Sequence, residues 1–182
     1  MATAPQIGNE REQVVATLRQ SRDRYLHCLK TVPESAASIR LTPGSWSILE
    51  VAEHVAAAEH GMFRGMEVAT AKTSPTNYAL DSEILKRGRN REVKGEAPER
   101  SRPKGRWKTM AEAIAAFENS RANTLAFAET GEKDPRSIEW QHPIFGPLDG
   151  HQVLLLMAAH AERHTAQIEE IKNCAAYKAA MK

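Results

Sequence analysis

Four helix-start signals are spaced along this chain of 182 residues, and they constrain its fold more than any other feature. Each is a Ser, Thr, Asn or Asp followed three residues later by Glu or Gln, so that each side chain can bind a backbone amide that the helix leaves unpaired. Proline and glycine residues lie between or beside them. The pairs are Asn9 with Glu12, Ser47 with Glu50, Thr109 with Glu112, and Asp149 with Gln152. They predict four helices, over about residues 9–31, 47–72, 109–130 and 149–178.

The predicted helices favour an all-α fold. Apolar residues recur at helical spacing within them, and no sustained alternation of polar and apolar residues predicts a strand. Hydrophobic residues make up 41% of the sequence, which is enough to line one continuous core. We therefore predict a single domain over residues 1–182, an all-α four-helix bundle with a long crossover between its second and third helices. The predicted core stripe of the first helix is Val14, Leu18, Tyr25 and Leu29.

The crossover, residues 73–108, is too long to be a structureless link inside a compact domain. We predict a short helix from Tyr78 to Lys86, ended by Gly88, and then an extended surface crossing. Such a connection would let the second and third helices run in the same direction. The crossover is also basic, because it holds ten Lys or Arg against five Asp or Glu in a chain of net charge +2. The short helix is expected to bury Leu80, Ile84 and Leu85.

Composition bounds the setting and the partners of the protein. With 26% charged residues, a mean hydropathy of −0.52 and no apolar run of about 20 residues, we expect a water-soluble, cytoplasmic protein with no membrane contact. The small net charge does not by itself indicate nucleic acid as a partner. Cys28 and Cys174 form no C-x-x-C pattern, and we interpret them as small buried residues.

The fourth predicted helix departs from a plain bundle because three successive positions of its core-facing seam are polar: His160, His164 and Gln167. An imidazole or amide buried without a partner costs on the order of a few kcal/mol. Two histidines four residues apart on a helix direct their rings to the same point, as two ligands of a divalent metal ion do. The apolar seam residues are Val153, Met157 and Ile171.

His54 supplies a third imidazole, because it lies on the apolar stripe that the second helix should present inward. The spacing therefore makes His54, His160 and His164 a candidate metal site. The alternative is that all three are core or partly exposed histidines that bind their neighbours. The sequence places the other four outside this cluster: His27 near a helix end, His60 and His151 on other helix faces, and His142 in the loop before the fourth helix, where we expect a structural role.

Three segments of the chain carry a family resemblance. They are residues 46–54, the loop His142-Pro143-Ile144-Phe145-Gly146-Pro147-Leu148, and the run His160-Ala161-Glu162-Arg163-His164-Thr165-Ala166-Gln167-Ile168. Together they resemble the DinB-like superfamily of damage-inducible bundles over about residues 10–172. The long basic crossover is similar to that of its YfiT-like, thiol-transferase branch. The resemblance implies a four-helix bundle with a long crossover, frequent homodimers, and a metal site whose ligands by position are His54, His160 and His164.

Three imidazoles leave open positions on a divalent ion, as catalytic sites do. We favour zinc or nickel, although iron and manganese also accept imidazole. The resemblance implies a metal-dependent transferase that activates a low-molecular-weight thiol, such as bacillithiol or mycothiol, for attack on a small-molecule electrophile. Two alternatives stay open: a metal-dependent hydrolase that uses bound hydroxide, and a non-enzymatic stress-response module that contacts nucleic acid through the basic crossover. The acidic remainder of the chain argues against the nucleic-acid module.

Other side chains could support such a site. We expect Glu50, one turn before His54, and Gln167 to orient the imidazoles. Arginines of the crossover could bind carboxylates of a thiol cofactor if the segment folds over the site, and otherwise belong to a solvated loop. These arginines are Arg87, Arg89 and Arg91.

Overall fold

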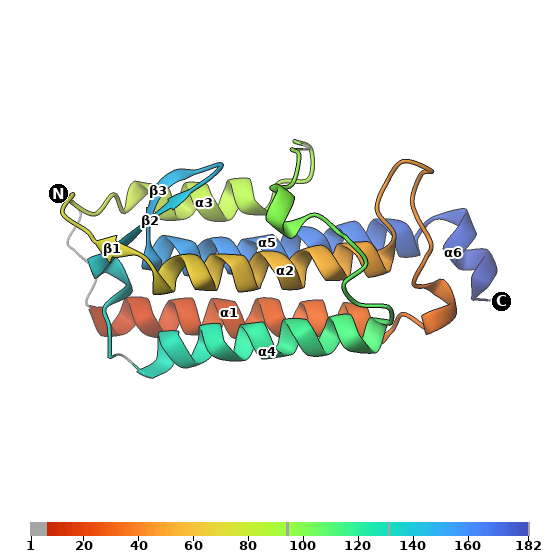
Figure 1. The fold of residues 1–182 in the computed structure, drawn as a ribbon, viewed down its shortest axis with the longest axis horizontal. Coiled ribbons are helices and arrows are strands. Elements are labelled where there is room, and N and C mark those ends of the chain that lie inside the picture. Colours follow the sequence, from red (N-terminus) through yellow and green to blue (C-terminus); the bar gives the residue numbers. More distant parts are fainter. Residues whose placement is uncertain (1–6, 94, 131, 182) are drawn as a thin grey trace.

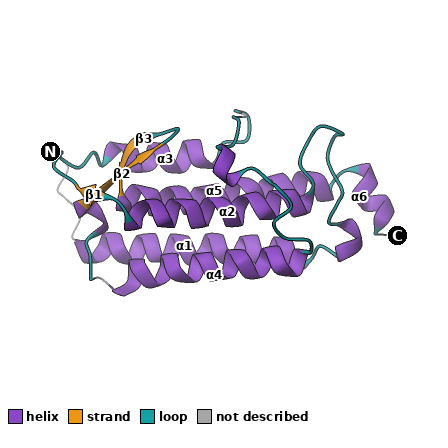
Figure 2. Cartoon of the chain, in the orientation of Figure 1, coloured by secondary structure: helices purple, strands orange, loops and turns teal. Residues whose placement is uncertain are grey.

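In a computed structural model the chain forms long helices and one small sheet, and residues 7–93, 95–130 and 132–181 are described (Figure 1, Figure 2). The helices are α1 (Ile7–Lys30), α2 (Ile48–Glu67), α3 (Ala79–Arg89), α4 (Met110–Thr130), α5 (Gly150–Lys172) and α6 (Ala175–Ala180). The strands are β1 (Thr70–Ala71), β2 (Ile138–His142) and β3 (Gly146–Asp149). Across the described ranges, no helix is both long enough and apolar enough to cross a membrane.

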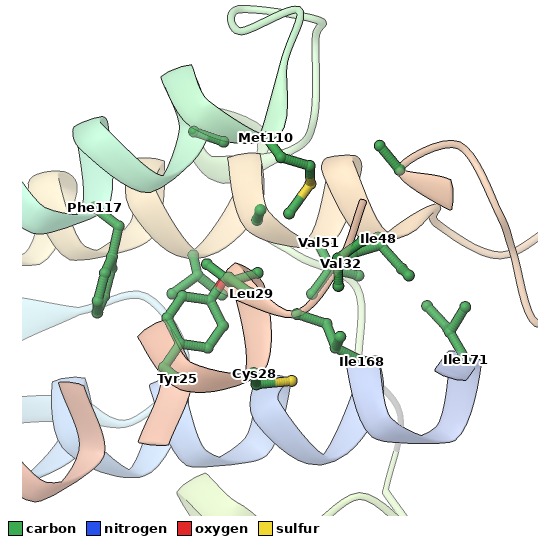
Figure 3. Close-up of a cluster of buried hydrophobic side chains, with 14 of the residues drawn as sticks. Tyr25, Cys28, Leu29, Val32, Ile48, Val51, Met110, Phe117, Ile168 and Ile171 are labelled. Carbon is green, nitrogen blue, oxygen red and sulfur yellow. The ribbon is translucent and has the colours of Figure 1, made fainter. Parts of the chain in front are cut away.

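Helices α1, α2, α4 and α5 form the bundle. In Figure 1, α1 and α5 run in one direction, and α2 and α4 run in the other. The crossover therefore does let α2 and α4 run parallel, as predicted. One apolar cluster joins the N-terminal halves of α2 and α4 to the C-terminal halves of α1 and α5, and a second cluster fills the opposite end of the bundle. Figure 3 shows the first of these, which includes Tyr25, Leu29, Ile48, Val51, Phe117 and Ile168.

Three of the four helix-start signals act as predicted, because side chain and backbone exchange hydrogen bonds in both directions. The pairs that do so are Ser47 with Glu50, Thr109 with Glu112, and Asp149 with Gln152. The prediction for Asn9 is wrong. Helix α1 already begins at Ile7, so Asn9 lies inside it, and its side chain accepts a hydrogen bond from Gln13 Nε2 at 2.6 Å.

Helix α3 is the short helix predicted within the crossover, and it packs against the outer side of α5 (Figure 1). Gly88 does not end it. A Cβ at Gly88 would lie 2.7 Å from the Cβ of Ala159, so the glycine lets the two helices approach closely. With α3 on one side and the bundle on the other, α5 is buried around its whole circumference from His151 to Ala159, not along a single stripe.

The small sheet was not predicted. Its strand order is β1-β2-β3, both pairings are antiparallel, and β2 and β3 form a hairpin. The sheet replaces the last turns expected of the second helix, which ends at Glu67 and not near residue 72. The ring of Trp140 on β2 occupies the space that a side chain at Gly65 of α2 would need. The fourth predicted helix is also shorter, because α5 stops at Lys172 and α6 is a separate helix.

A buried ion pair joins all four bundle helices between the two apolar clusters. The guanidinium of Arg121 on α4 binds both carboxylate oxygens of Glu59 on α2, at 2.6 and 2.9 Å. It also donates to the Leu18 carbonyl and the Ser21 hydroxyl of α1, and to the Met157 carbonyl of α5. Both ionised side chains are almost fully buried. Hydrogen bonds to every neighbouring helix are what make this burial tolerable.

Breaking this pair should destabilise the bundle strongly. Glu59→Gln leaves the charge of Arg121 buried without its counterion, and we expect the free energy of unfolding to fall by about 3–5 kcal/mol. Urea denaturation of the metal-free protein measures this free energy of unfolding. Arg19→Gln is the control, because it removes an exposed pair between α1 and α4, Arg19 with Glu129, and should cost at most about 1 kcal/mol. Equal losses in the two variants would contradict the role of the buried pair.

Candidate metal centre

Three imidazole rings converge where α2 meets α5. Nε2 of His160 lies 3.1 Å from Nε2 of His54 and 3.1 Å from Nε2 of His164. His54 and His164 are buried, and His160 is half-buried. The structure thus brings together the three histidines that the sequence singled out. They do not lie at the centre of the bundle, however, because the Arg121–Glu59 pair occupies that position and the histidines face the crossover.

The opposite ring nitrogens of two of these histidines are held by acceptors. Nδ1 of His54 donates to the carbonyl oxygen of Ser101 at 2.8 Å, and Nδ1 of His164 donates to Oε1 of Gln167 at 2.7 Å. Gln167, which was expected to orient an imidazole, therefore contacts the ring of His164. Glu50 does not, since its carboxylate binds the Ser47 amide and the Arg40 guanidinium. The Ser101 carbonyl, which no sequence pattern indicated, takes that role for His54.

Glu53 anchors the segment that carries this carbonyl. Its carboxylate is only 1% exposed and accepts hydrogen bonds from the backbone amides of Lys104 and Gly105, at 2.7 and 2.9 Å. It also binds the guanidinium of Arg106 at 2.7 Å. Burial opposes ionisation, but these bonds outweigh it and hold the pKa of the Glu53 carboxyl below its usual value. The residue beside His54 in the sequence thus fixes the crossover that orients the His54 ring.

The surroundings of all three imidazoles favour the neutral form, which is the form that binds metal. Burial is the largest cause that lowers the pKa of each. The pKa of His160 and that of His164 are lowered further because a charge on either ring would be repelled by the other rings of the cluster. The Arg163 guanidinium also lowers the pKa of all three.

The donor set fits a divalent cation. With Nδ1 protonated in His54 and His164, both Nε2 lone pairs point at Nε2 of His160. One proton on His160 satisfies one of these neighbours well and leaves the other lone pair poorly paired, in a buried place where an unpaired polar group costs about 1–3 kcal/mol. A single cation can accept all three lone pairs, and three imidazole nitrogens are a ligand set that zinc and related metals use in catalytic sites.

A cavity of about 600 Å³ opens above the three histidines. Its walls come from α2, α3 and α5, from the turn between β2 and β3, and from loop residues 41, 42, 44–46, 90, 91, 93 and 95–98. Of the crossover arginines, Arg87 and Arg91 line this cavity. Arg89 does not, because it turns to Glu162 and forms an ion pair. The crossover therefore does fold over the site, but only two of the three predicted arginines face it.

The remaining histidines lie apart from the centre. His27 and His60 are exposed. His142 has the structural role expected, since its Nδ1 accepts the backbone amides of Ile144 and Phe145 at 3.1 Å and so shapes the β2–β3 turn. Burial lowers the pKa of His142 to about 4.

A second cluster of potential ligands, Glu10, Asp81 and His151, lies at the other end of α5. Its carboxylates already have a cation. Arg136 binds Glu10 at 2.9 Å and Asp81 at 2.6 Å, and also reaches Asp149. The guanidinium stands where a metal ion would have to bind, so this cluster is an ion-pair network.

The fold and this site define a four-helix bundle with three imidazoles converging on one face. Residues 17–168 match the family model of the DinB superfamily, and the chain belongs to that superfamily. No curated protein matches the chain in sequence.

Two solved structures share the fold. The four-helix bundle protein TT2238 is 21% identical with a TM-score of 0.55, and the match covers 87% of this chain and 98% of that one. YfiT from Bacillus subtilis is 14% identical with a TM-score of 0.61, and the match covers 94% of this chain and 90% of that one. YfiT is described as a probable metal-dependent hydrolase with an unusual four-helix bundle topology.

Removing the charge of Glu53 should loosen the crossover over the site. In Glu53→Gln the new side chain has the size of glutamate but one acceptor oxygen fewer. We therefore expect faster hydrogen exchange at the amides of Lys104 and Gly105. If the centre binds metal, affinity should also fall by about tenfold, because the orientation of His54 is lost. Hydrogen exchange followed by mass spectrometry measures the first effect. Glu99→Gln, an exposed carboxylate of the same segment, is the control, and equal exchange in both variants would contradict the anchor.

The folded protein should lose stability below pH 6.5 partly through His142. Because its pKa is lowered from 6.5 to about 4, the unfolded state binds a proton in this range that the folded state does not. Between pH 7 and pH 5 we expect a loss of about 1–2 kcal/mol from this residue. His142→Asn keeps a side-chain acceptor for the turn and removes the titration. Urea denaturation at both pH values should show a smaller loss for His142→Asn than for the wild type, and identical losses would refute the assignment.

Proposed function

We propose that the chain is a metal-dependent enzyme whose ligands are His54, His160 and His164. The observation that carries this proposal is that Nε2 of His160 lies 3.1 Å from Nε2 of both His54 and His164, with two of the rings oriented by acceptors at Nδ1. A structural site would enclose its ion with four protein ligands, whereas three imidazoles beneath an open cavity leave room for a reactant.

Each part of the site has a task in this proposal. A divalent ion bound by three neutral imidazoles supplies Lewis acidity that lowers the pKa of a thiol or water. The Ser101 carbonyl and Gln167 keep two of the rings aimed at a common point. Trp46, whose ring centroid lies 4.8 Å from that of His54, forms part of the cavity wall beside the ligands. The cavity then holds the second reactant.

The reaction we propose is transfer of a low-molecular-weight thiol, such as bacillithiol or mycothiol, to a small electrophile. The family resemblance supports the thiol, and the open cavity supports a second substrate. Hydrolysis is the alternative, and the description of YfiT as a probable metal-dependent hydrolase favours it. Zinc or nickel is the proposed metal. A homodimer stays a prediction.

A nucleic-acid-binding role is less well supported, because much of the positive charge of the crossover is already paired. Arg91 binds Glu170, Arg102 binds Glu96, and Arg106 binds Glu53. Arginines held in such pairs are poorly available to phosphates.

Metal analysis of untagged protein tests the ligands. We expect about one equivalent of zinc or nickel per wild-type chain and a loss of at least about tenfold in affinity for His160→Ala. His60→Ala, an exposed histidine of α2, should bind as the wild type does. Equal metal content in all three proteins would overturn the proposed centre.

The metal-loaded protein then decides between the two reactions. Conjugation of a generic electrophile such as monochlorobimane, at a rate that depends on both metal and added thiol, is expected for a transferase. Metal-dependent cleavage of a nitrophenyl ester without added thiol is expected for a hydrolase. Absence of conjugation with several thiols would exclude the transferase and leave the metal centre standing.

A further inference from the structure

The charges that line the cavity do not cancel. Arg91 is paired with Glu170 at 2.9 Å, and Glu96 is paired with Arg102 at 2.9 Å. Two cationic side chains of the lining remain, Arg87 and Arg163. Within the described part of the chain, no carboxylate lies at ion-pair distance from either of them. The cavity therefore carries an excess of positive charge before any metal ion is added.

Both guanidiniums are held by the surrounding structure. Arg163 lies on α5 between His160 and His164 and donates to the Val93 carbonyl at 2.8 Å. Arg87 on α3 lies over the ring of Phe145, 4.9 Å from its centroid. Arg163 is half-buried, so its charge is only partly screened by solvent. Side chains restrained in this way lose little conformational freedom when they bind an anion.

The mouth of the same cavity is apolar. Leu41, Val93 and Ile144 are 44%, 70% and 58% exposed, which places them among the most exposed large hydrophobic side chains of the described residues. They come from three separate segments, yet all three line this cavity. Trp46 and Phe145 extend the apolar surface inward. Exposed apolar side chains gathered around one opening indicate a ligand-binding surface.

We propose that the cavity binds an organic anion with an apolar body, in which Arg163 and Arg87 hold the acidic group and Trp46, Ile144 and Phe145 contact the body. The inference deepens the proposed function, on which it rests, by naming the chemical class of the reactant. The anion-binding residues are not metal ligands, so the two ideas can fail separately.

Electrostatics favour this class over a neutral ligand. A guanidinium near three imidazoles repels a divalent cation, and this cost falls when an anion lies between the two charges. An acidic group in the cavity therefore aids metal binding, and the metal aids anion binding, because coupling between two ligands is reciprocal.

Three ligands of matched structure test the proposal: 4-phenylbutyrate, 4-phenylbutan-1-ol and butyrate. Isothermal titration calorimetry on the metal-free full chain should show that 4-phenylbutyrate binds at least about tenfold more tightly than either partial analogue, because only it has both parts. Equal affinity for the alcohol and the carboxylate would overturn the anion site. Equal affinity for butyrate and phenylbutyrate would overturn the apolar contact.

Variants locate the site. Arg163→Gln should weaken phenylbutyrate binding by about tenfold, and Arg163→Lys should restore part of it because the charge returns without the planar fork. Arg87→Gln should also weaken it. Arg89→Gln is the matched control on α3, since Arg89 pairs with Glu162 outside the cavity, and it should bind as the wild type does. Unchanged binding in both Arg163→Gln and Arg87→Gln would refute the assignment.

Separate readouts distinguish this proposal from the metal centre. If the His160→Ala variant retains its metal and phenylbutyrate binding is still weakened by Arg163→Gln, the metal proposal fails and the anion site stands. If His160→Ala loses its metal as expected but Arg163→Gln binds phenylbutyrate as the wild type does, only the anion-site proposal fails. In the metal-loaded protein, displacement of phenylbutyrate by 3-mercaptopropionate would show that the thiol substrate carries the acidic group. Simultaneous binding of the two ligands would show that the electrophile carries it. Both of these last results support the proposal.

Discussion

The ion pair between Arg121 and Glu59 sets the geometry on which the rest of the molecule depends. Because one guanidinium binds groups on α1, α2 and α5 from its own helix α4, no helix can slide along the bundle axis without breaking a buried hydrogen bond. Glu59 lies five residues after His54, and Met157 lies three residues before His160. The bonds that hold the bundle together therefore also set the heights at which the imidazoles of α2 and α5 meet. A core that contained only apolar side chains would constrain this register less strictly.

The crossover is part of the site and not a simple connection. Its helix α3 forms one wall of the cavity, and the segment after it returns across α2, where Glu53 holds it. The basic composition of the crossover follows from this course, since several of its arginines pair with acidic residues of α2 and α5. Arg87 of the crossover and Arg163 of α5 both line the cavity, and no carboxylate of the described residues lies at ion-pair distance from either, so their charge remains available for a ligand.

The features that could be predicted from sequence depend on local spacing. Three helix starts follow from pairs three residues apart, and the meeting of His160 with His164 follows from a separation of four. The hairpin was missed because Ile138, Trp140 and His142 alternate with polar residues over only five positions. The partner of His54 could not be found, because a carbonyl 47 residues away has no side-chain signature. Glu50 lies one turn before His54 and Glu53 directly precedes it, and only the fold shows that the first serves the cap and the second holds the crossover.

The use of a main-chain carbonyl at Ser101 has a consequence for how this protein can change over time. The side chain of residue 101 can be exchanged without removing the group that aligns the ring, since every amino acid carries the same carbonyl. The number of residues between Ser101 and the amides that Glu53 binds is constrained more tightly, because an insertion there would shift that oxygen relative to the anchor. Related sequences can therefore drift in composition along this stretch while they keep its length.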